Sequence, residues 1–296
     1  MTTRYRFFPG LILFFSAAIL TDVGYAQENL DPIIPIDFAK VAIHDSFWSP
    51  RLERIRTVTI PHCIQYAEFK TGHIKNFERA ATHKKGKHEG NNAFDSDVYK
   101  IMEGMANSLK MHPDKVLEQK MDEWIDKIAA AQFSDGYIDT YITLQEGIEN
   151  KWTQTDLQEC YCAGHLIEAA VAYYKATGKR NFLDIAIRLA NRHWLPGHEE
   201  IEIALVKLYR VTHNIKYLNL SEWFIEQRGH GYFYGKPYST PDYYQSDVPV
   251  KDARKIVGHA VRAMYLYSAV TDLSIIKKKI PATCLHYLAG LFNSKK

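Results

Sequence analysis

A short unit that opens with Gly-His occurs three times between Cys160 and Thr271, and it limits the folds open to this chain. The copies begin at Gly164-His165, Gly197-His198 and Gly258-His259, and each ends in a tyrosine followed three or four residues later by a threonine. In the first two copies a polar turn and a second amphipathic segment follow. The first two histidines are 33 residues apart. This repetition predicts stacked αα-hairpins, each of which buries its apolar face against its neighbours.

The residues before the repeat predict more helices of the same array. Residues 95–97 (Asp-Ser-Asp) resemble a helix N-cap, and a partner helix is expected from about Lys115 to Gln132. Arg51 to Lys70 is also predicted to be helical, with Pro61 splitting or kinking it. Thr71 to Asn92 is polar and predicts a loop. The chain as a whole is therefore predicted to be all-α.

The repeated histidines carry the functional content of the pattern. Each Gly-His pair is expected at the start of the first helix of its hairpin, so His165, His198 and His259 would lie at equivalent helix ends and face one place. Unpaired backbone N–H groups and the positive end of the helix dipole would add a donor-rich rim suited to hydroxyls or anions. A single histidine at a helix start is more often a cap or a surface group. That alternative stays open for each of the three.

Composition excludes some classes of partner. The chain has 296 residues, of which 46% are hydrophobic, so it can bury a large core. The formal net charge is only +3 and no block of basic residues occurs, which argues against nucleic acid as a partner.

The first 26 residues resemble a secretory signal peptide. Arg4 and Arg6 precede an apolar run from Leu11 to Leu20, and small residues occur before Gln27. The apolar run is too short for a permanent membrane span, although an uncleaved anchor is the alternative. We therefore expect a periplasmic or secreted bacterial protein.

Four cysteines, Cys63, Cys160, Cys162 and Cys284, offer little support for a disulfide or a metal site. Cys160 and Cys162 lie two residues apart on a predicted helix, where their side chains point in different directions. Zinc needs about four clustered ligands, and one Cys-x-Cys is weak support for it. We expect all four to be buried or unpaired thiols.

A loop rich in aromatic residues surrounds Asp135-Gly136-Tyr137, where Asp-Gly predicts a tight turn. Tyr137, Tyr141 and Trp152 have flat faces of the kind that bind sugars, together with polar groups. The alternative, an aromatic loop that only packs on the helix ends, stays equally open.

Several stretches resemble glycoside hydrolase family 127, the β-L-arabinofuranosidases. They are Glu159-Cys-Tyr-Cys-Ala-Gly-His165-Leu-Ile-Glu-Ala-Ala-Val, Gly197-His-Glu-Glu-Ile-Glu-Ile-Ala-Leu-Val-Lys, Asp95-Ser-Asp-Val-Tyr-Lys100, Asp135-Gly-Tyr, Phe47-Trp48-Ser-Pro-Arg51-Leu and Val257-Gly-His-Ala-Val-Arg-Ala-Met264. The resemblance covers roughly Ile36 to Leu273.

The resemblance implies an (α/α)6 toroid that removes L-arabinofuranose from the non-reducing ends of β-L-arabinofuranosides with retention. It implies a cysteine thiolate on zinc as nucleophile and a glutamate as acid/base. We expect residues 27–273 to form an incomplete toroid and residues 274–296 a divergent tail. The family's catalytic glutamates and zinc-binding cysteines are expected beyond the matching stretch, and Cys160 and Cys162 do not match them. The catalytic residues are therefore unassigned, and this chain is not expected to hold the zinc.

The resemblance also assigns candidate residues for substrate. His165, His198 and His259 match family histidines at the sugar pocket, and Asp97 and Tyr137 are further candidates. The implied ligand is a plant-type glycan that contains arabinose. A non-catalytic helical-repeat module that binds a carbohydrate or a protein is the alternative hypothesis.

Overall fold

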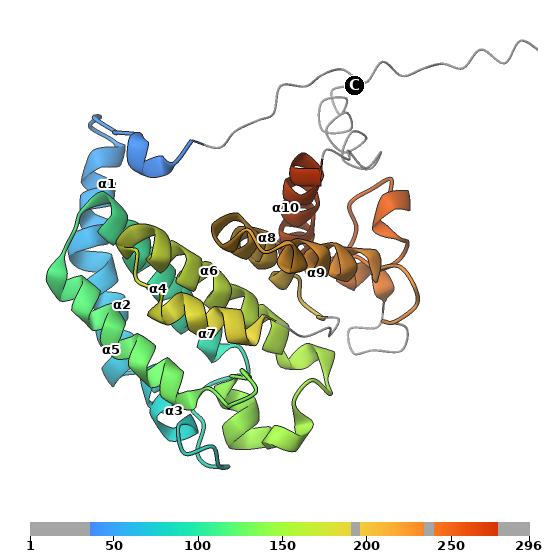
Figure 1. Cartoon of the computed structure of the whole chain (residues 1–296), viewed down its shortest axis with the longest axis horizontal. Coiled ribbons are helices and arrows are strands. Elements are labelled where there is room, and N and C mark those ends of the chain that lie inside the picture. Colours follow the sequence, from blue (N-terminus) through green and yellow to red (C-terminus); the bar gives the residue numbers. More distant parts are fainter. Residues whose placement is uncertain (1–35, 191–195, 234–239, 278–296) are drawn as a thin grey trace, which may run out of the picture. The chain divides into compact units, whose positions relative to one another are not determined.

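Helices make up the described part of this computed structural model, which covers residues 36–190, 196–233 and 240–277 (Figure 1). These residues belong to one unit that runs from Pro35 to Lys296, and no β-strand occurs among them. The expected signal peptide, residues 1–26, and most of the expected tail, residues 274–296, lie outside the described ranges. None of the described helices is long and apolar enough to cross a membrane. The prediction of an all-α fold is confirmed.

Successive helical hairpins build the array that the repeat predicted. Helix α4 (Phe94–Met111) pairs with α5 (Lys115–Ala131), α6 (Glu159–Thr177) with α7 (Asn181–Leu189), and α8 (Ile201–Thr212) with α9 (Ile215–Glu226). Helix α10 (Ala260–Lys277) opens the next copy.

The hairpins are arranged in two layers (Figure 1). The first helices pack in series, α4 on α6, α6 on α8, and α8 on α10, while α5 packs on both α3 (His73–Ala80) and α7. First helices in one layer and second helices in another are the arrangement of an (α/α) toroid, and the described residues form part of one.

The threonine that ends each copy has the same role in the first two hairpins. The hydroxyls of Thr177 and Thr212 each donate to the carbonyl four residues earlier and accept from the N–H two residues later. The next residue, Gly178 or His213, has a positive φ of 75° or 55°, which ends the helix. Thr271 makes the same bond to the carbonyl four residues earlier, but α10 continues beyond it.

Two predicted helix starts had different outcomes. Asp95 is not the cap of α4, which begins at Phe94, because its buried carboxylate instead accepts hydrogen bonds from the N–H and hydroxyl of Thr140, at 2.7 and 2.5 Å. Asp114 does cap α5, since its carboxylate accepts from the N–H groups of residues 116 and 117. Asp95 is drawn away from the cap position by a residue distant in sequence, Thr140, whereas Asp114 caps its helix through bonds to neighbouring residues.

The helix expected from Arg51 to Lys70 is interrupted at its proline, as predicted. Helix α1 (Trp48–Arg54) passes through one π-helical turn (Ile55–Thr59) into α2 (Ile60–Phe69). Pro61 has no N–H to donate to the preceding turn, and the helix is irregular just before it.

The prediction of a loop from Thr71 to Asn92 was wrong, because α3 lies inside this stretch. Ile74, Phe77 and Ala80 recur every third residue and are at most 3% exposed. Since α3 packs on α5, this narrow apolar face is enough to hold the helix. The polar average of the stretch concealed that face.

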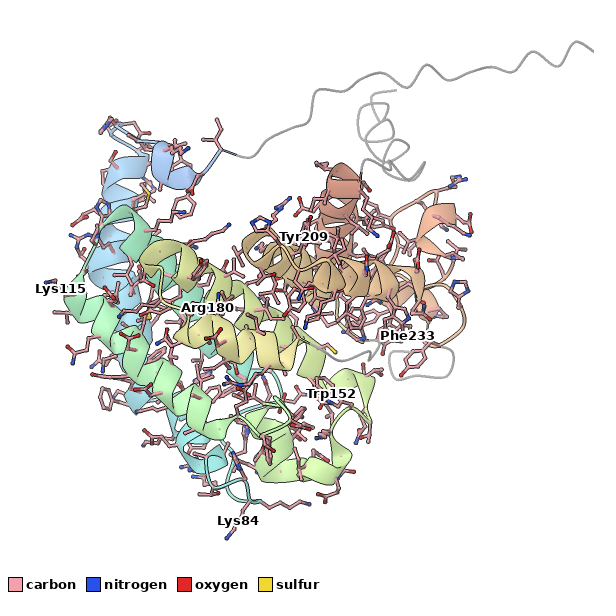
Figure 2. The ribbon with its side chains drawn as sticks, in the orientation of Figure 1. Lys84, Lys115, Trp152, Arg180, Tyr209 and Phe233 are labelled. Atoms are coloured by element: carbon pink, nitrogen blue, oxygen red, sulfur yellow. The ribbon has the colours of Figure 1, made fainter. Side chains whose placement is uncertain are left out.

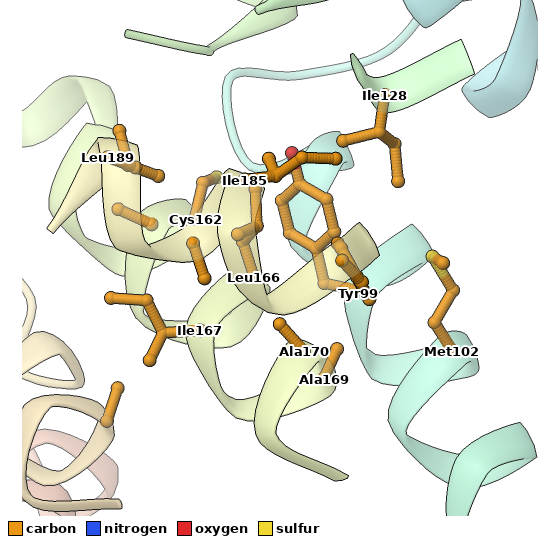
Figure 3. Packing of buried hydrophobic residues seen from close by; sticks show 14 of the residues in the cluster. Tyr99, Met102, Ile128, Cys162, Leu166, Ile167, Ala169, Ala170, Ile185 and Leu189 are labelled. Atoms are coloured by element: carbon orange, nitrogen blue, oxygen red, sulfur yellow. The ribbon is translucent and has the colours of Figure 1, made fainter. Parts of the chain in front are cut away.

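Helix α6 lies at the centre of the core. It packs against α4, α7 and α8, and 13 of its 19 residues are buried, as expected for a helix that is apolar on most sides. Figure 3 shows Leu166 and Ile167 of α6 among Tyr99 and Met102 of α4 and Ile185 of α7. Its position between two first helices places its side chains next to both neighbouring copies.

Candidate functional site

The structure brings the three repeated histidines into one cluster, in which Tyr161 contacts His165 and His198. The centroid of the Tyr161 ring lies 4.6 Å from that of His165 and 4.4 Å from that of His198. The ring of His198 lies 6.3 Å from that of His259. His198 and His259 are half-buried, and His165 is buried. Residues from three successive copies thus form one cluster, although their part in binding stays a prediction.

His165 does not lie at a helix start, so that part of the expectation was wrong. Helix α6 begins at Glu159, six residues earlier, whereas His198 and His259 precede the first residues of α8 and α10. The chain turns at Gln158, whose φ is 65°, and the residues after it continue as helix. Gly164 is therefore a packing glycine inside α6 rather than a sign of the helix start.

Tyrosines complete the cluster, and the sequence analysis did not single them out. The ring of Tyr265 lies 5.8 Å from that of His198 and 6.0 Å from that of His165, and Tyr243 lies 5.6 Å from His259. Tyr161 is four residues before His165, a spacing that places both on one face of a helix and could have revealed it. The others depend on the packing of α10 and its preceding loop, which sequence spacing does not show.

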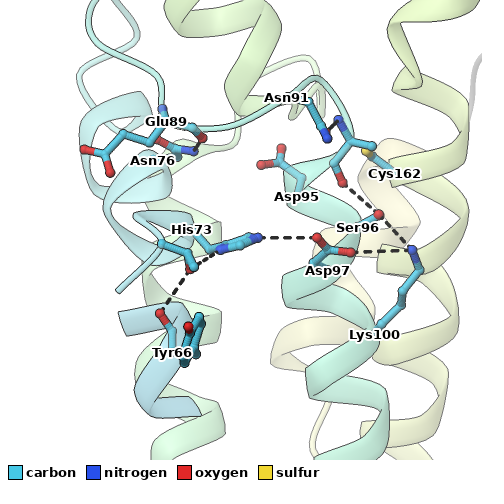
Figure 4. Close-up of polar contacts among 12 residues, drawn as sticks. Tyr66, His73, Asn76, Glu89, Asn91, Asp95, Ser96, Asp97, Lys100 and Cys162 are labelled. Atoms are coloured by element: carbon cyan, nitrogen blue, oxygen red, sulfur yellow. Dashed lines mark hydrogen bonds and ion pairs between the residues drawn. The ribbon is translucent and has the colours of Figure 1, made fainter. Parts of the chain in front are cut away.

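Lys100 connects Asp97 to the cluster. Its ammonium donates to the Tyr161 hydroxyl at 2.8 Å. Figure 4 shows the same ammonium beside Ser96 Oγ, to which it donates at 3.0 Å, and beside the Asp97 carboxylate, 3.8 Å away. Asp97 is exposed and also lies 3.4 Å from His73 Nε2. The hydrogen bond from His73 lowers the pKa of Asp97. Asp97 is thus a charged group at the edge of the cluster.

Tyr137 has its polar group engaged elsewhere. Its hydroxyl donates to Glu159 Oε1 at 2.6 Å, and its ring meets Trp152 edge-on, with centroids 5.2 Å apart. The side chain is buried, and Gly136 has a φ of 89°, as the predicted tight turn requires. The structure shows no contact between Tyr137 and the three histidines, and the alternative of an aromatic loop packed on helix ends describes these contacts.

Burial favours the neutral imidazole form of His165 and His198. It lowers the pKa of His165 to about 3 and that of His198 to about 4, and Lys100 and Arg262 respectively act in the same direction. His198 Nδ1 lies 2.7 Å from the carbonyl of Glu199. A neutral imidazole offers one donor and one acceptor, the combination that a sugar hydroxyl can use.

A buried arginine holds the segment that carries His198. The guanidinium of Arg228 lies 2.8 Å from Glu199 and 3.3 Å from Glu202, and all three side chains are at most 1% exposed. It also donates to the carbonyls of Pro196 and Tyr244. These bonds tie the start of α8 to the loop that follows α9. The chain segment that carries His198 is therefore held in place by a buried network centred on Arg228.

Metal-ligating groups meet at one place in the described part of the chain. His165, Glu168 and Glu200 are all buried, and one potential ligand atom from each lies within 4.8 Å of the others. The ammonium of Lys207 pairs with Glu168 there. No cysteine belongs to this group.

The described residues do not fit the cysteine-bound zinc that the sequence resemblance implies. Cys63, Cys160 and Cys162 form no disulfide, and Cys284 lies outside the described residues. Burial raises the pKa of Cys160 and Cys162 well above the usual range of a thiol, which disfavours the thiolate that zinc requires.

Two hollows in the described part lie away from the histidines. A small apolar cavity of about 20 Å³ is lined in part by Trp152 (labelled in Figure 2) and Cys160. A groove of about 280 Å³ runs between α9 and α10 and is lined in part by Glu222 and Leu273. Neither is lined by His165, His198 or His259.

The structure is an array of helical hairpins in which imidazole and tyrosine side chains from successive copies form one cluster. Residues 40–281 match the family model described as the β-L-arabinofuranosidase, GH127 catalytic domain. The chain belongs to this glycoside hydrolase family. The resemblance to glycoside hydrolase family 127 that the sequence indicated is thereby confirmed.

The relatives agree with this assignment. A non-reducing end β-L-arabinofuranosidase from Bifidobacterium longum subsp. longum is 34% identical over 282 residues, covering 79% of this chain and 43% of the relative. A solved GH127 β-L-arabinofuranosidase from Geobacillus stearothermophilus T6 is 36% identical, with a TM-score of 0.77 over 83% of this chain and 44% of that one. A second solved GH127 β-arabinofuranosidase is 39% identical, with a TM-score of 0.75; the match covers 84% of this chain and 41% of that one. The chain thus spans less than half the length of these relatives.

Proposed function

We propose that this chain recognises the terminal L-arabinofuranose of a β-L-arabinofuranoside and forms the sugar-binding part of a retaining glycosidase. The observation that carries the proposal is one cluster in which the rings of His165 and His198 contact Tyr161 and the ring of His259 lies next to that of His198. Family membership and the names of the relatives support the choice of sugar. The natural ligand would be a plant-type glycan that contains arabinose.

The chemistry of the cluster suits a neutral sugar. Furanose hydroxyls both donate and accept hydrogen bonds, and neutral imidazoles and tyrosine hydroxyls do the same. The rings of Tyr161 and Tyr265 add flat apolar surface for the C–H face of the sugar. Lys100 and Asp97 would contact substituents at the edge, because Lys100 already bonds to Tyr161.

Catalysis would need groups in addition to the described ones. In the reaction that the family resemblance implies, a cysteine held on zinc would serve as the nucleophile and a glutamate as the acid for the leaving oxygen. Cys160 and Cys162 are unsuited to the first role because they are buried and protonated. We infer that the longer relatives carry these groups outside the matched part, that this chain supplies recognition without zinc, and that residues 1–26 direct it to the periplasm or beyond.

Calorimetry with methyl β-L-arabinofuranoside tests the proposal. We expect binding by the purified chain and a loss of at least tenfold in affinity for His198→Ala, since one neutral hydrogen bond and its packing are removed. His112→Ala, an exposed histidine outside the cluster, is the matched control and should bind normally. Failure of the wild-type chain to bind, with its helical content intact, would refute the recognition proposal. Hydrolysis of the same glycoside by the chain alone would refute our division between recognition and catalysis.

A non-catalytic module that binds a protein is the second candidate. It is favoured by exposed apolar side chains on the segment that leads into α2, where Phe47, Trp48, Leu52, Ile55 and Val58 are each 44–57% exposed. Binding of the arabinofuranoside with loss in His198→Ala would decide for the sugar.

A further inference from the structure

Two buried carboxyl groups face the same nitrogen of His165. Glu200 Oε1 lies 3.5 Å and Glu168 Oε2 3.7 Å from His165 Nδ1. The three residues are 0%, 6% and 4% exposed in the order Glu200, Glu168, His165. Neither ring nitrogen of His165 has a hydrogen-bond partner among the described residues. An imidazole that is buried and oriented toward carboxyl groups, yet holds no bond of its own, is poised for a ligand.

We propose that Glu168 and Glu200 are positioning residues that hold His165 in its Nδ1-protonated form and so leave Nε2 as the acceptor for a sugar hydroxyl. The inference deepens the proposed function, because it assigns a direction to one hydrogen bond in the sugar site. Glu168 and Glu200 touch no substrate in this scheme. They act through the imidazole.

The charges around the three side chains decide where the proton lies. The ammonium of Lys207 pairs with the carboxyl group of Glu168. Burial, followed by the neighbouring Glu168, raises the pKa of Glu200 well above its usual range and favours its protonated form. Nδ1 of the imidazole therefore faces oxygen atoms of two carboxyl groups, one of which is paired with an ammonium. Donation from Nδ1–H to these oxygens is the favourable arrangement.

Other charged groups around His165 favour its neutral form. Burial has the largest effect on the pKa of His165; Lys100, His198 and Lys207 also disfavour a second proton on the ring, whereas Asp97 acts in the opposite direction. One ring nitrogen then carries the proton and the other accepts. The ring of Tyr161 meets that of His165 edge-on at 4.6 Å and fixes the plane of the imidazole. The orientation of the acceptor is thus set before a sugar arrives.

The same three side chains are close enough to share a divalent cation, which is the competing interpretation. Lys207 argues against it, because its ammonium already balances the charge of Glu168. A cation at this place would bind Nδ1 and require it to lose its proton. The two interpretations therefore predict opposite protonation of one nitrogen.

Nitrogen NMR of the whole chain, labelled with ¹⁵N-histidine, separates them. Without sugar or metal we expect the proton of His165 on Nδ1, the less common form of a neutral histidine. Glu200→Gln keeps an acceptor in place and should preserve this form, whereas Glu200→Leu should shift the population to the Nε2-protonated form. Glu103→Gln, next to Glu168 and Lys207 but without a bond to His165, is the matched control and should leave the spectrum unchanged.

Sugar binding supplies the second readout. Glu200→Leu should weaken methyl β-L-arabinofuranoside roughly three- to tenfold, and Glu200→Gln should restore it. A wild-type spectrum with the proton on Nε2 would overturn the proposal, as would a shift of the Nδ1 signal on addition of micromolar zinc alone. If the proton is on Nδ1 but no variant and no wild-type chain binds the sugar, the positioning holds and the proposed function fails. The wild-type spectrum decides even if Glu200→Leu does not fold.

Discussion

Gly164 of α6 lies directly against Glu200 at the start of α8. A Cβ atom at Gly164 would be 2.5 Å from Glu200 Cγ and 3.0 Å from the backbone nitrogen of Ile201. The first glycine of the repeated Gly-His pairs thus permits the close approach of two first helices. This approach is what places Glu200 beside His165.

Gly164→Ala should therefore destabilise the fold even though alanine favours helices. We expect the free energy of unfolding to fall by about 1–3 kcal/mol, since α6 and α8 must move apart. Urea denaturation followed by circular dichroism measures the change. Gly104→Ala in the exposed part of α4 is the control, because its Cβ would meet no atom within 4 Å. This control should gain roughly 0.5–1 kcal/mol, and a gain in both variants would contradict the packing argument.

Arg228→Leu tests the buried network behind His198. It leaves Glu199 and Glu202 without their guanidinium in full burial, which should cost about 3–5 kcal/mol of unfolding free energy. Arg180→Leu breaks an exposed pair with Asp184 (Arg180 is labelled in Figure 2) and should cost less than about 1 kcal/mol. Equal denaturation midpoints for the two variants would refute a stabilising role of the network.

The histidines predict a loss of stability in acid. An unfolded histidine is protonated below about pH 6.5, whereas the folded His198 stays neutral until about pH 4. The unfolded chain therefore binds more protons in this window, and the contribution present above pH 6.5 is lost as the pH falls toward 4. Between pH 7 and pH 5 the wild-type chain should lose about 1–2 kcal/mol more than His198→Gln.

The quantity to measure is the difference in unfolding free energy between the wild-type chain and His198→Gln, because buried carboxyl groups change the stability of both proteins with pH in the opposite direction. Burial raises the pKa of Asp95 to about 6 and that of Glu199 to about 7, so their contribution is lost as the pH rises through these values. Urea titrations of both proteins at pH 5 and pH 7 give the difference. A constant difference would contradict the assignment of a neutral His198.

Tyr161 should contribute to sugar binding through its ring more than through its hydroxyl. Tyr161→Leu removes the surface that contacts His165 and His198, and we expect affinity for methyl β-L-arabinofuranoside to fall roughly tenfold. Tyr161→Phe keeps the ring and loses the hydroxyl that bonds with Lys100 and Tyr265, so a change below about threefold is expected. Calorimetry gives both values, and the reverse order would place the contact on the hydroxyl.

The thiols should differ in reactivity. Cys63 is half-buried on α2, whereas Cys160 and Cys162 are buried and protonated. Alkylation at pH 8 should therefore modify Cys63 first among these three. Peptide mass spectrometry at successive times identifies the order. Early labelling of Cys160 or Cys162 would show that α6 opens more readily than its packing implies.

Much of the fold could be predicted from local chemistry. The Gly-His and Tyr-Thr pattern indicated the hairpins, because a threonine hydroxyl and a residue with positive φ end a helix through bonds within a few residues. Asp114 likewise caps α5 with its own neighbours. Composition, by contrast, did not predict α3. The stretch is polar on average, and its three buried residues stabilise a helix only because α5 covers their narrow face.

The candidate site depended on tertiary structure in a different way. The sequence by itself determined that three histidines recur at matching places and that the chain resembles family 127. Only the packing of α6, α8 and α10 decided that Tyr161 joins them, that His165 lies inside α6 and that Glu200 faces its Nδ1. The physical reason is range: helix periodicity and capping act over a few residues, whereas the distance between two helices is set by the contacts of residues far apart in sequence, such as Gly164 and Glu200.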